Sequence, residues 1–193
     1  MFKVVAVILA VATVVYAQQK ACSAGGTAPT EAKEFLAVHN KLRASISAGT
    51  YVAKGKKMPA AKTTIPAMTW DCALEQSAQK VANTCVFAHS KDRNNVGENL
   101  YYAMRSAGVT KAGQGAAASK AWENEFQDYG WSNIKLSMAV FNSGIGHATQ
   151  MAWAKSTKLG CATALCQGNK QAITVCHYKD AGNMLNANVY EPK

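Results

Sequence analysis

The chain has 193 residues and a formal net charge of +10 at pH 7. That length suits one domain with its own hydrophobic core. The positive charge admits nucleic acid, anionic lipid or polyanionic glycan as partners. The lysines are scattered, however, and the densest run (Lys54, Lys56, Lys57, Lys62) lies in a Gly- and Pro-containing loop without interleaved aromatic residues. We therefore interpret that run as a solvated loop and expect no nucleic-acid partner.

The first seventeen residues, MFKVVAVILAVATVVYA, indicate a secretory signal peptide. Lys3 precedes an unbroken apolar stretch, and Val15 and Ala17 are the small residues expected before a cleavage site. The apolar stretch is too short to span a membrane comfortably, and no basic stop-transfer run follows it. We therefore predict a signal peptide over 1–17, a single secreted domain over 18–193, and no transmembrane segment.

Six cysteines lie in the predicted mature part: Cys22, Cys72, Cys85, Cys161, Cys166 and Cys176. An even count in an exported chain predicts three disulfides. Without a CxxC pair, a zinc ribbon is not expected. The sequence by itself leaves all fifteen pairings open.

The N-terminal half of the mature chain predicts two helices. Thr30 is expected to cap the first, over 30–48, with Gly49 ending it and apolar residues at helical spacing: Phe35, Val38, Leu42 and Ile46. A loop is expected over 49–66. Asp71 is then expected to cap a second helix, with one stripe formed by Leu74, Ala78, Val81 and Cys85. The next stretch, to residue 102, is interpreted as loop with a short helical turn at its end.

The C-terminal half predicts one helix followed by strands. The helix is expected near 116–129, ending at Gly130. Strands are expected over 147–154, 158–164 and 171–178, the last two forming a hairpin. Helices followed by strands favour an α+β fold or a three-layer sandwich.

Glu125 is the most unusual polar residue in this pattern. On a helix it shares a face with Trp122, Phe126 and Tyr129. An unpaired carboxylate in an apolar layer would cost several kcal/mol, on the order of the penalty for a buried ion. We therefore expect Glu125 to have a partner: a cation, a metal or a group of donors. Glu123 points elsewhere and is expected to be solvated.

Three more polar residues adjoin apolar runs: His89, Glu98 and His147. With neutral imidazoles, two histidines and two glutamates in one cleft would carry −2 and attract a divalent cation. Each residue also has an ordinary structural explanation. A histidine near an apolar run is more often a hydrogen-bonded core residue, and a glutamate can sit at a helix start or in an ion pair. Spacing alone does not choose between these interpretations.

Several motifs, in order, resemble those of the CAP superfamily, which includes cysteine-rich secretory proteins, antigen 5 and pathogenesis-related 1 proteins (SCP/TAPS). GHATQMAW (146–153) resembles its GHYTQVVW signature, and CHYKDAGN (176–183) its second signature. HNKLR (39–43), His89-Ser90, GENL (97–100) and WENEF (122–126) match its other motifs. FQDYGW, GTYVAKG and FNSGIGHATQMAWAKS look most like nematode SCP-like and venom-allergen-like (activation-associated secreted) proteins.

The resemblance implies a disulfide-stabilised α-β-α sandwich with a central antiparallel sheet and a large cleft. It implies that His89, Glu98, Glu125 and His147 form a tetrad in that cleft, and that His89 and His147 can hold Zn²⁺ or another divalent cation. It also implies a Cys161–Cys176 disulfide. Ala148 replaces the usual aromatic residue, and Asp180 stands where proline is common.

Three functions remain open at this stage. The first is a secreted, non-enzymatic protein that binds a sterol or fatty acid, as the resemblance implies, with a groove expected between helices 30–48 and 116–129. The second is a metal-dependent hydrolase using the tetrad. Against it stand the lack of HExxH, one histidine fewer than the usual three zinc ligands, and no G-x-S-x-G for a serine mechanism. The third is a surface-acting ligand for a receptor or anionic glycan, in host–parasite interaction or secreted defence. We favour the first, and the oligomeric state stays open.

Overall fold

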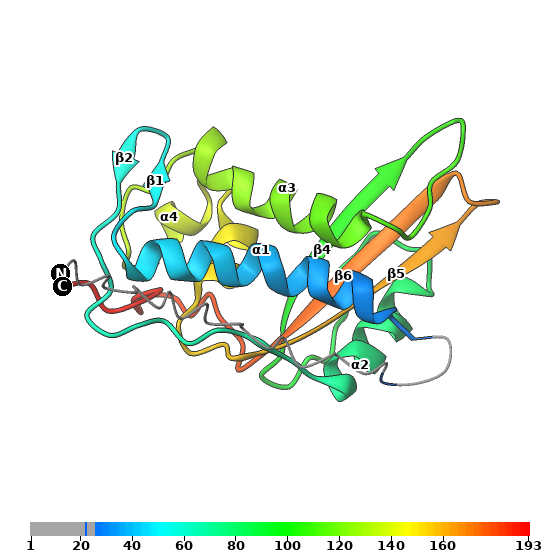
Figure 1. The fold of residues 1–193 in the computed structure, drawn as a ribbon, viewed down its shortest axis with the longest axis horizontal. Coiled ribbons are helices and arrows are strands. Elements are labelled where there is room, and N and C mark those ends of the chain that lie inside the picture. The colour runs from blue at the N-terminus through cyan, green and yellow to red at the C-terminus, as the bar shows by residue number, and fades with distance from the viewer. Residues whose placement is uncertain (1–21, 23–25) are drawn as a thin grey trace, which may run out of the picture.

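The computed structural model describes Cys22 and residues 26–193, so the predicted signal peptide lies outside the described residues. The elements follow in this order: α1 Pro29–Ser47, β1 Val52–Ala53, β2 Lys56–Lys57, β3 Thr69–Trp70, α2 Cys72–Ala82, β4 Gly97–Met104, α3 Gln114–Asp128, α4 Met138–Phe141, α5 Gly146–Ala152, β5 Lys158–Cys166 and β6 Gln171–Lys179 (Figure 1). Of the helices in this described part, none is long and apolar enough to cross a membrane.

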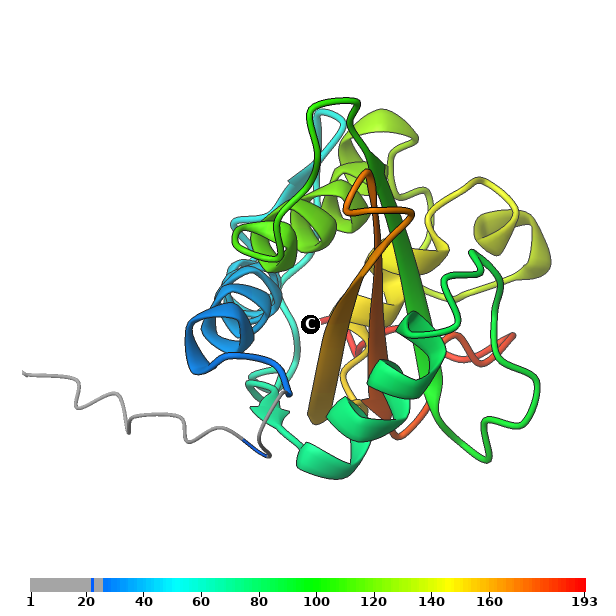
Figure 2. The same ribbon diagram turned by 90° about the vertical axis from the view of Figure 1, so that its right-hand side faces the viewer.

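The central sheet has the order β3-β5-β6-β4. The pairs β5–β6 and β6–β4 are antiparallel, and only the two-residue β3 pairs in parallel, with β5. Helix α2 packs on β5 and β6 from one side, while α1 and α3 contact the sheet from the other (Figure 2). The predicted three-layer α-β-α sandwich with a largely antiparallel sheet is therefore confirmed.

Strand register brings the cysteines of the hairpin together. Cys161 and Cys176 are directly opposite in the β5–β6 ladder and form the expected disulfide. The other two bridges join Cys22 to Cys72 and Cys85 to Cys166. Both involve the α2 region, so they tie α2 to the N-terminal segment and to the end of β5.

Asp71 caps α2 as predicted, because its carboxylate accepts hydrogen bonds from the backbone N–H groups of Ala73 and Leu74. The first helix begins differently from the prediction. Its cap position is Ala28, and the Glu31 carboxylate accepts the Ala28 N–H, so Thr30 lies inside the first turn. Proline at position 29 fixes this earlier start, since proline suits the first turn of a helix.

The cap predicts a measurable loss of stability. Asp71→Ala removes the acceptor for two N–H groups at the start of α2, and we expect it to lower the free energy of unfolding by about 1 kcal/mol. Urea unfolding of the disulfide-intact protein measures the change. Asp128→Ala, at the end of α3, is the control, and a loss at Asp71 no larger than at Asp128 would argue against the cap.

Two predicted elements were wrong. Residues 97–102, which were interpreted as loop with a short helical turn, belong to edge strand β4, and β4 pairs with β6 along its whole length. Residues 147–154, predicted as a strand, form helix α5 and its C-terminal end. The strand was expected because His147, Thr149, Met151 and Trp153 alternate along the sequence. All five residues from Ala148 to Ala152 are buried, however, so this alternation does not mark a strand with one exposed face.

Arg43 explains why α5 ends where it does. Its guanidinium is buried and donates to the carbonyls of Met151, Trp153 and Ala154, and also to that of Pro66. These bonds satisfy carbonyl groups that the end of a helix leaves without partners. The long helix α1 thereby fixes α5, which carries His147.

The predicted loop 49–66 is mostly irregular but includes the small β1–β2 hairpin.

Candidate functional site

One cleft of about 280 Å³ is lined by all four tetrad residues, His89, Glu98, Glu125 and His147. They come from four segments: the loop after α2, strand β4, helix α3 and helix α5. Further lining residues are Asn99, Phe141, Gly144, Gly146 and Asn183. The structure therefore brings together four side chains that are separated by as many as 58 positions in the sequence.

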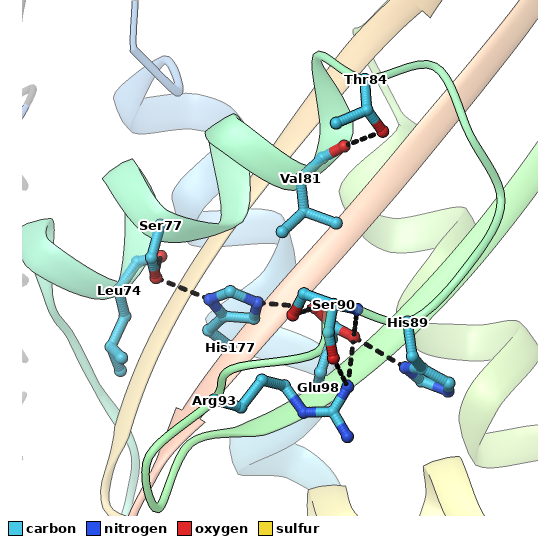
Figure 3. Close-up of polar contacts among 9 residues, drawn as sticks. All are labelled: Leu74, Ser77, Val81, Thr84, His89, Ser90, Arg93, Glu98 and His177. Carbon is cyan, nitrogen blue, oxygen red and sulfur yellow. Dashed lines mark hydrogen bonds and ion pairs between the residues drawn. The ribbon is translucent and has the colours of Figure 1, made fainter.

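Glu98 is the most completely bonded carboxylate in the described part of the chain. Its Oε1 accepts from His89 Nδ1 at 2.7 Å, from the Ser90 backbone N–H at 3.0 Å and from Arg93 at 2.8 Å. Its Oε2 accepts from Ser90 Oγ at 2.7 Å and from His177 Nε2 at 2.9 Å. Figure 3 shows these donors converging on the carboxylate from the loop and from β6.

This environment decides the charge of Glu98. Its side chain has no exposed surface, and burial alone raises the pKa of a carboxyl group. Hydrogen bonds from His177, Ser90 and His89 act in the opposite direction and outweigh burial, so the pKa falls from 4.5 to about 2. Glu98 is therefore a buried, permanent anion at neutral pH.

Glu125 has the partner that its position on an apolar helix face required. Its Oε1 accepts from His147 Nδ1 at 2.5 Å, and its Oε2 accepts from the Ala148 backbone N–H at 3.0 Å. The ring of Trp122 stacks on the His147 ring, with centroids 6.1 Å apart and planes 16° apart. Tyr129 was expected to lie in the same apolar layer as Trp122 and Phe126. This was wrong, because Tyr129 is exposed at the end of α3.

The other glutamate of α3 also differs from its prediction. Glu123 was expected to be solvated, yet it is half-buried. Burial raises its pKa, while Lys41 and Lys120 partly oppose that rise. It lies two residues from Glu125 and outside the cleft lining, which makes it a useful control position.

The two halves of the tetrad share one arrangement. Each histidine uses Nδ1 to bond a glutamate, and neither Nε2 has a hydrogen-bond partner among the described residues. A carboxylate on Nδ1 fixes the ring and makes the other nitrogen a better metal ligand. Within residues 26–193 and Cys22, no group of three or more His, Cys, Asp or Glu side chains is placed to hold a metal. The metal ligands that the cleft offers are thus the two imidazole Nε2 atoms of His89 and His147.

Sequence reasoning missed two residues of this site, Arg93 and His177. His177 lies directly opposite Glu98 in the β4–β6 ladder, which puts both side chains on the same face of the sheet. A strand pattern over 97–104 would have been the signal for this pairing, but the sequence up to residue 102 was interpreted as loop and turn. Arg93 belongs to the loop before β4, where no periodicity marks it.

His39 is a core residue. It is fully buried; its Nδ1 donates to the Phe35 carbonyl, and its Nε2 accepts from the Tyr178 hydroxyl. Burial lowers its pKa to about 3, so the ring is neutral. The Asn99 amide donates to the same hydroxyl and to the His147 carbonyl, and so connects this core to the cleft.

The groove predicted between α1 and α3 is closely packed at the start of α3. A Cβ atom added at Gly115 would lie 3.1 Å from the Glu31 carbonyl oxygen and 3.1 Å from the Phe35 ring. Sterol or fatty-acid binding there stays a prediction from the resemblance.

The sequence profile named "Cysteine-rich secretory protein family" (CAP) matches residues 36–178, which include all four tetrad residues. The chain belongs to the CAP family. The likeness to nematode secreted proteins is also confirmed. Ancylostoma secreted protein from Ancylostoma caninum is 38% identical over 167 residues, which is 81% of this chain and 38% of that relative. Venom allergen 5 from Rhynchium brunneum is 38% identical over 181 residues, covering 86% of this chain and 75% of that protein.

Solved CAP structures agree in fold. The crystal structure of NaASP2 with Zn²⁺ has a TM-score of 0.83 at 36% identity, and covers 89% of this chain and 90% of that one. BmVAL-1 has a TM-score of 0.82 at 38% identity, with 88% and 86% covered. Because the chain spans only 38% of the Ancylostoma relative, the activity of that whole protein does not transfer to it.

Proposed function

We propose that this CAP protein is secreted and that its cleft binds a divalent cation, with His89 Nε2 and His147 Nε2 as the protein ligands. The observation that carries the proposal is the repeated carboxylate–histidine pair. Glu98 holds the Nδ1 atom of one ring and Glu125 that of the other, and both rings line the same cleft. That a CAP relative was crystallised with Zn²⁺ supports the choice of metal.

The charges of the cleft favour a cation. Glu98 is fully buried and ionised, and its positive partner Arg93 balances one charge. Glu125 adds a second acid whose bonds come from a histidine ring and a neutral backbone group. A dication bound at the open imidazole nitrogens would offset this second negative charge.

We further propose that the cleft binds and does not catalyse. A catalytic zinc site normally has three protein ligands and an open position for water, whereas this cleft offers two imidazoles. Both carboxylates that could serve as a general base already accept bonds from histidine and from the backbone. The cation would therefore order the cleft for a partner, with water completing its coordination.

Isothermal titration of the purified mature protein with Zn²⁺ at pH 7 tests the cation site. We expect one site per chain. Glu125→Gln should weaken affinity by about 10- to 100-fold, because it removes the charge that orients the His147 ring. His147→Ala should weaken it at least as much, since it removes a ligand.

Glu123→Gln is the matched control, because it makes the same change two residues away on the same helix, outside the cleft. We expect it to bind Zn²⁺ as the unmodified protein does. Equal loss in the two glutamine variants, or Zn²⁺ binding that survives His89→Ala combined with His147→Ala, would contradict the proposal. Circular dichroism of each variant confirms that it is folded.

A further inference from the structure

A second pocket, of about 310 Å³, lies on the α2 side of the sheet. Ser77, Lys80 and Val81 of α2 line it together with Arg93, Val96 and His177. Ser90 and His177 line this pocket, and both bond the Glu98 carboxylate. Glu98 therefore lies between the second pocket and the cleft that contains the tetrad. The resemblance to the CAP family implied no role for this second pocket.

Three side chains form a continuous hydrogen-bonded line here. Ser77 Oγ lies 2.6 Å from His177 Nδ1, and His177 Nε2 lies 2.9 Å from Glu98 Oε2. Figure 3 shows the imidazole of His177 between the serine of α2 and the carboxylate of β4. His177 is nearly fully buried, while Ser77 is half-buried and lines the pocket.

The position of the protons follows from the donors that surround Glu98. Its oxygens already accept from the Ser90 N–H, from Ser90 Oγ and from Arg93, so Glu98 is the acceptor here as well and His177 Nε2 is the donor. In the neutral ring Nδ1 then has a free lone pair, and the short contact from Ser77 must be an O–H donated to it. The alternative acceptor for that hydroxyl is the Leu74 carbonyl, at 2.9 Å.

We propose that Ser77, His177 and Glu98 form a serine–histidine–glutamate centre that cleaves small neutral carboxylic esters in the second pocket. Ser77 is the nucleophile and His177 the general base. Glu98 holds the imidazole in the tautomer that accepts the serine proton, as the acid does in other triads. The activity goes beyond the proposed cation binding and uses different protein atoms, apart from the shared carboxylate.

The reaction balances without a cofactor. Ser77 Oγ bonds to the ester carbonyl carbon as its proton moves to His177 Nδ1. The bond from that carbon to the alcohol oxygen breaks, and His177 returns the proton to the departing alcohol. Water, deprotonated by His177, then hydrolyses the acyl-serine to release the acid and restore Ser77. The sum is ester plus water giving acid plus alcohol.

The remaining lining residues suit this substrate class. Lys80 lies one turn after Ser77 on the same face of α2, and its ammonium group has no hydrogen-bond or ion-pair partner among the described residues. The guanidinium of Arg93 is held in place by bonds to Glu98 and to the Ser90 carbonyl. These two cations can stabilise the negative oxygen of the tetrahedral intermediate. Val81 and Val96 offer an apolar wall for a short acyl group.

Covalent labelling of the purified mature protein by a fluorophosphonate, followed by peptide mapping, tests the assignment. We expect one adduct per chain, on Ser77, and slow hydrolysis of p-nitrophenyl acetate. Ser77→Ala should abolish both. His177→Asn should slow labelling by at least about 100-fold, which is the usual contribution of a general base.

Ser45 is the matched control. It is also a half-buried helix serine whose Oγ donates to the carbonyl three residues earlier, but its hydroxyl contacts no histidine. Ser45→Ala should label and hydrolyse normally. Labelling should also be the same in EDTA as in Zn²⁺, so failure of the cation site would leave this result intact.

Two outcomes would overturn the proposal. One is a folded, unmodified protein that carries no adduct, or that labels Ser45 as readily as Ser77. The other is a folded His177→Asn variant that labels at the unmodified rate. If that variant does not fold, the ratio of Ser77 to Ser45 labelling in the unmodified protein decides the question alone.

Discussion

Replacing Glu98 with glutamine is expected to lower the free energy of unfolding by about 3 kcal/mol at pH 7. The carboxylate accepts five hydrogen bonds with no exposed surface, and the neutral amide leaves Arg93 without its buried counter-charge. The amide nitrogen would also face a hydrogen-bond donor. Urea unfolding in EDTA, with the disulfides intact, measures the loss without any contribution from a bound metal.

The loss should depend on pH in a defined direction. The folded-state pKa of Glu98 is about 2, below its ordinary value of 4.5. A lowered carboxyl pKa stabilises the fold fully above about pH 4.5, and that stabilisation disappears as the pH falls towards 2. The difference between Glu98→Gln and the unmodified protein should therefore shrink across this interval.

Glu123→Gln is again the control. Burial raises the pKa of Glu123, so neutralising that side chain removes an unfavourable charge and should leave stability unchanged or slightly higher. A pH-independent loss at Glu98, or an equal loss at Glu123, would contradict the charge assigned to the Glu98 network.

The residues that could be identified from the sequence are those whose chemistry conflicts with the residues around them. Glu125 was identified because a carboxylate on the same helix face as Trp122 and Phe126 needs a partner, and His147 is that partner. Asp71 was identified because aspartate before an amphipathic run accepts the first N–H groups of a helix. Both arguments depend only on local spacing, which is why the sequence sufficed.

Contacts that depend on strand register could not be predicted from the sequence. Glu98 meets His177 because β4 pairs with β6 in one register, and the sequence of β4 did not show a strand. Helix α5 was misjudged because the core surrounds it and Arg43 of another helix determines where it ends. The cleft was predictable through family motifs, whereas the Ser77–His177–Glu98 line required the fold.

Gly160→Ala is expected to lower the free energy of unfolding by at least about 3 kcal/mol, or to prevent folding, because α2 begins directly against the backbone of β5. A Cβ atom at this position would lie 2.2 Å from the Glu75 backbone nitrogen and 2.6 Å from the Asp71 carbonyl oxygen. Both contacts are with backbone atoms, so no side-chain rotation can relieve them, and α2 must move away from the sheet.

The control, Gly55→Ala, separates this clash from the ordinary loss of a glycine. Gly55 has a φ of +81° and no heavy atom within 4 Å of an added Cβ, so alanine there meets only backbone strain of about 1–2 kcal/mol. Equal losses at the two positions, measured by urea unfolding, would mean that α2 can shift at little cost. Gly160 is also paired with His177 in the β5–β6 ladder. Any displacement of α2 in a folded Gly160→Ala protein would therefore lengthen the contact between Ser77 and His177, and fluorophosphonate labelling should fall together with stability.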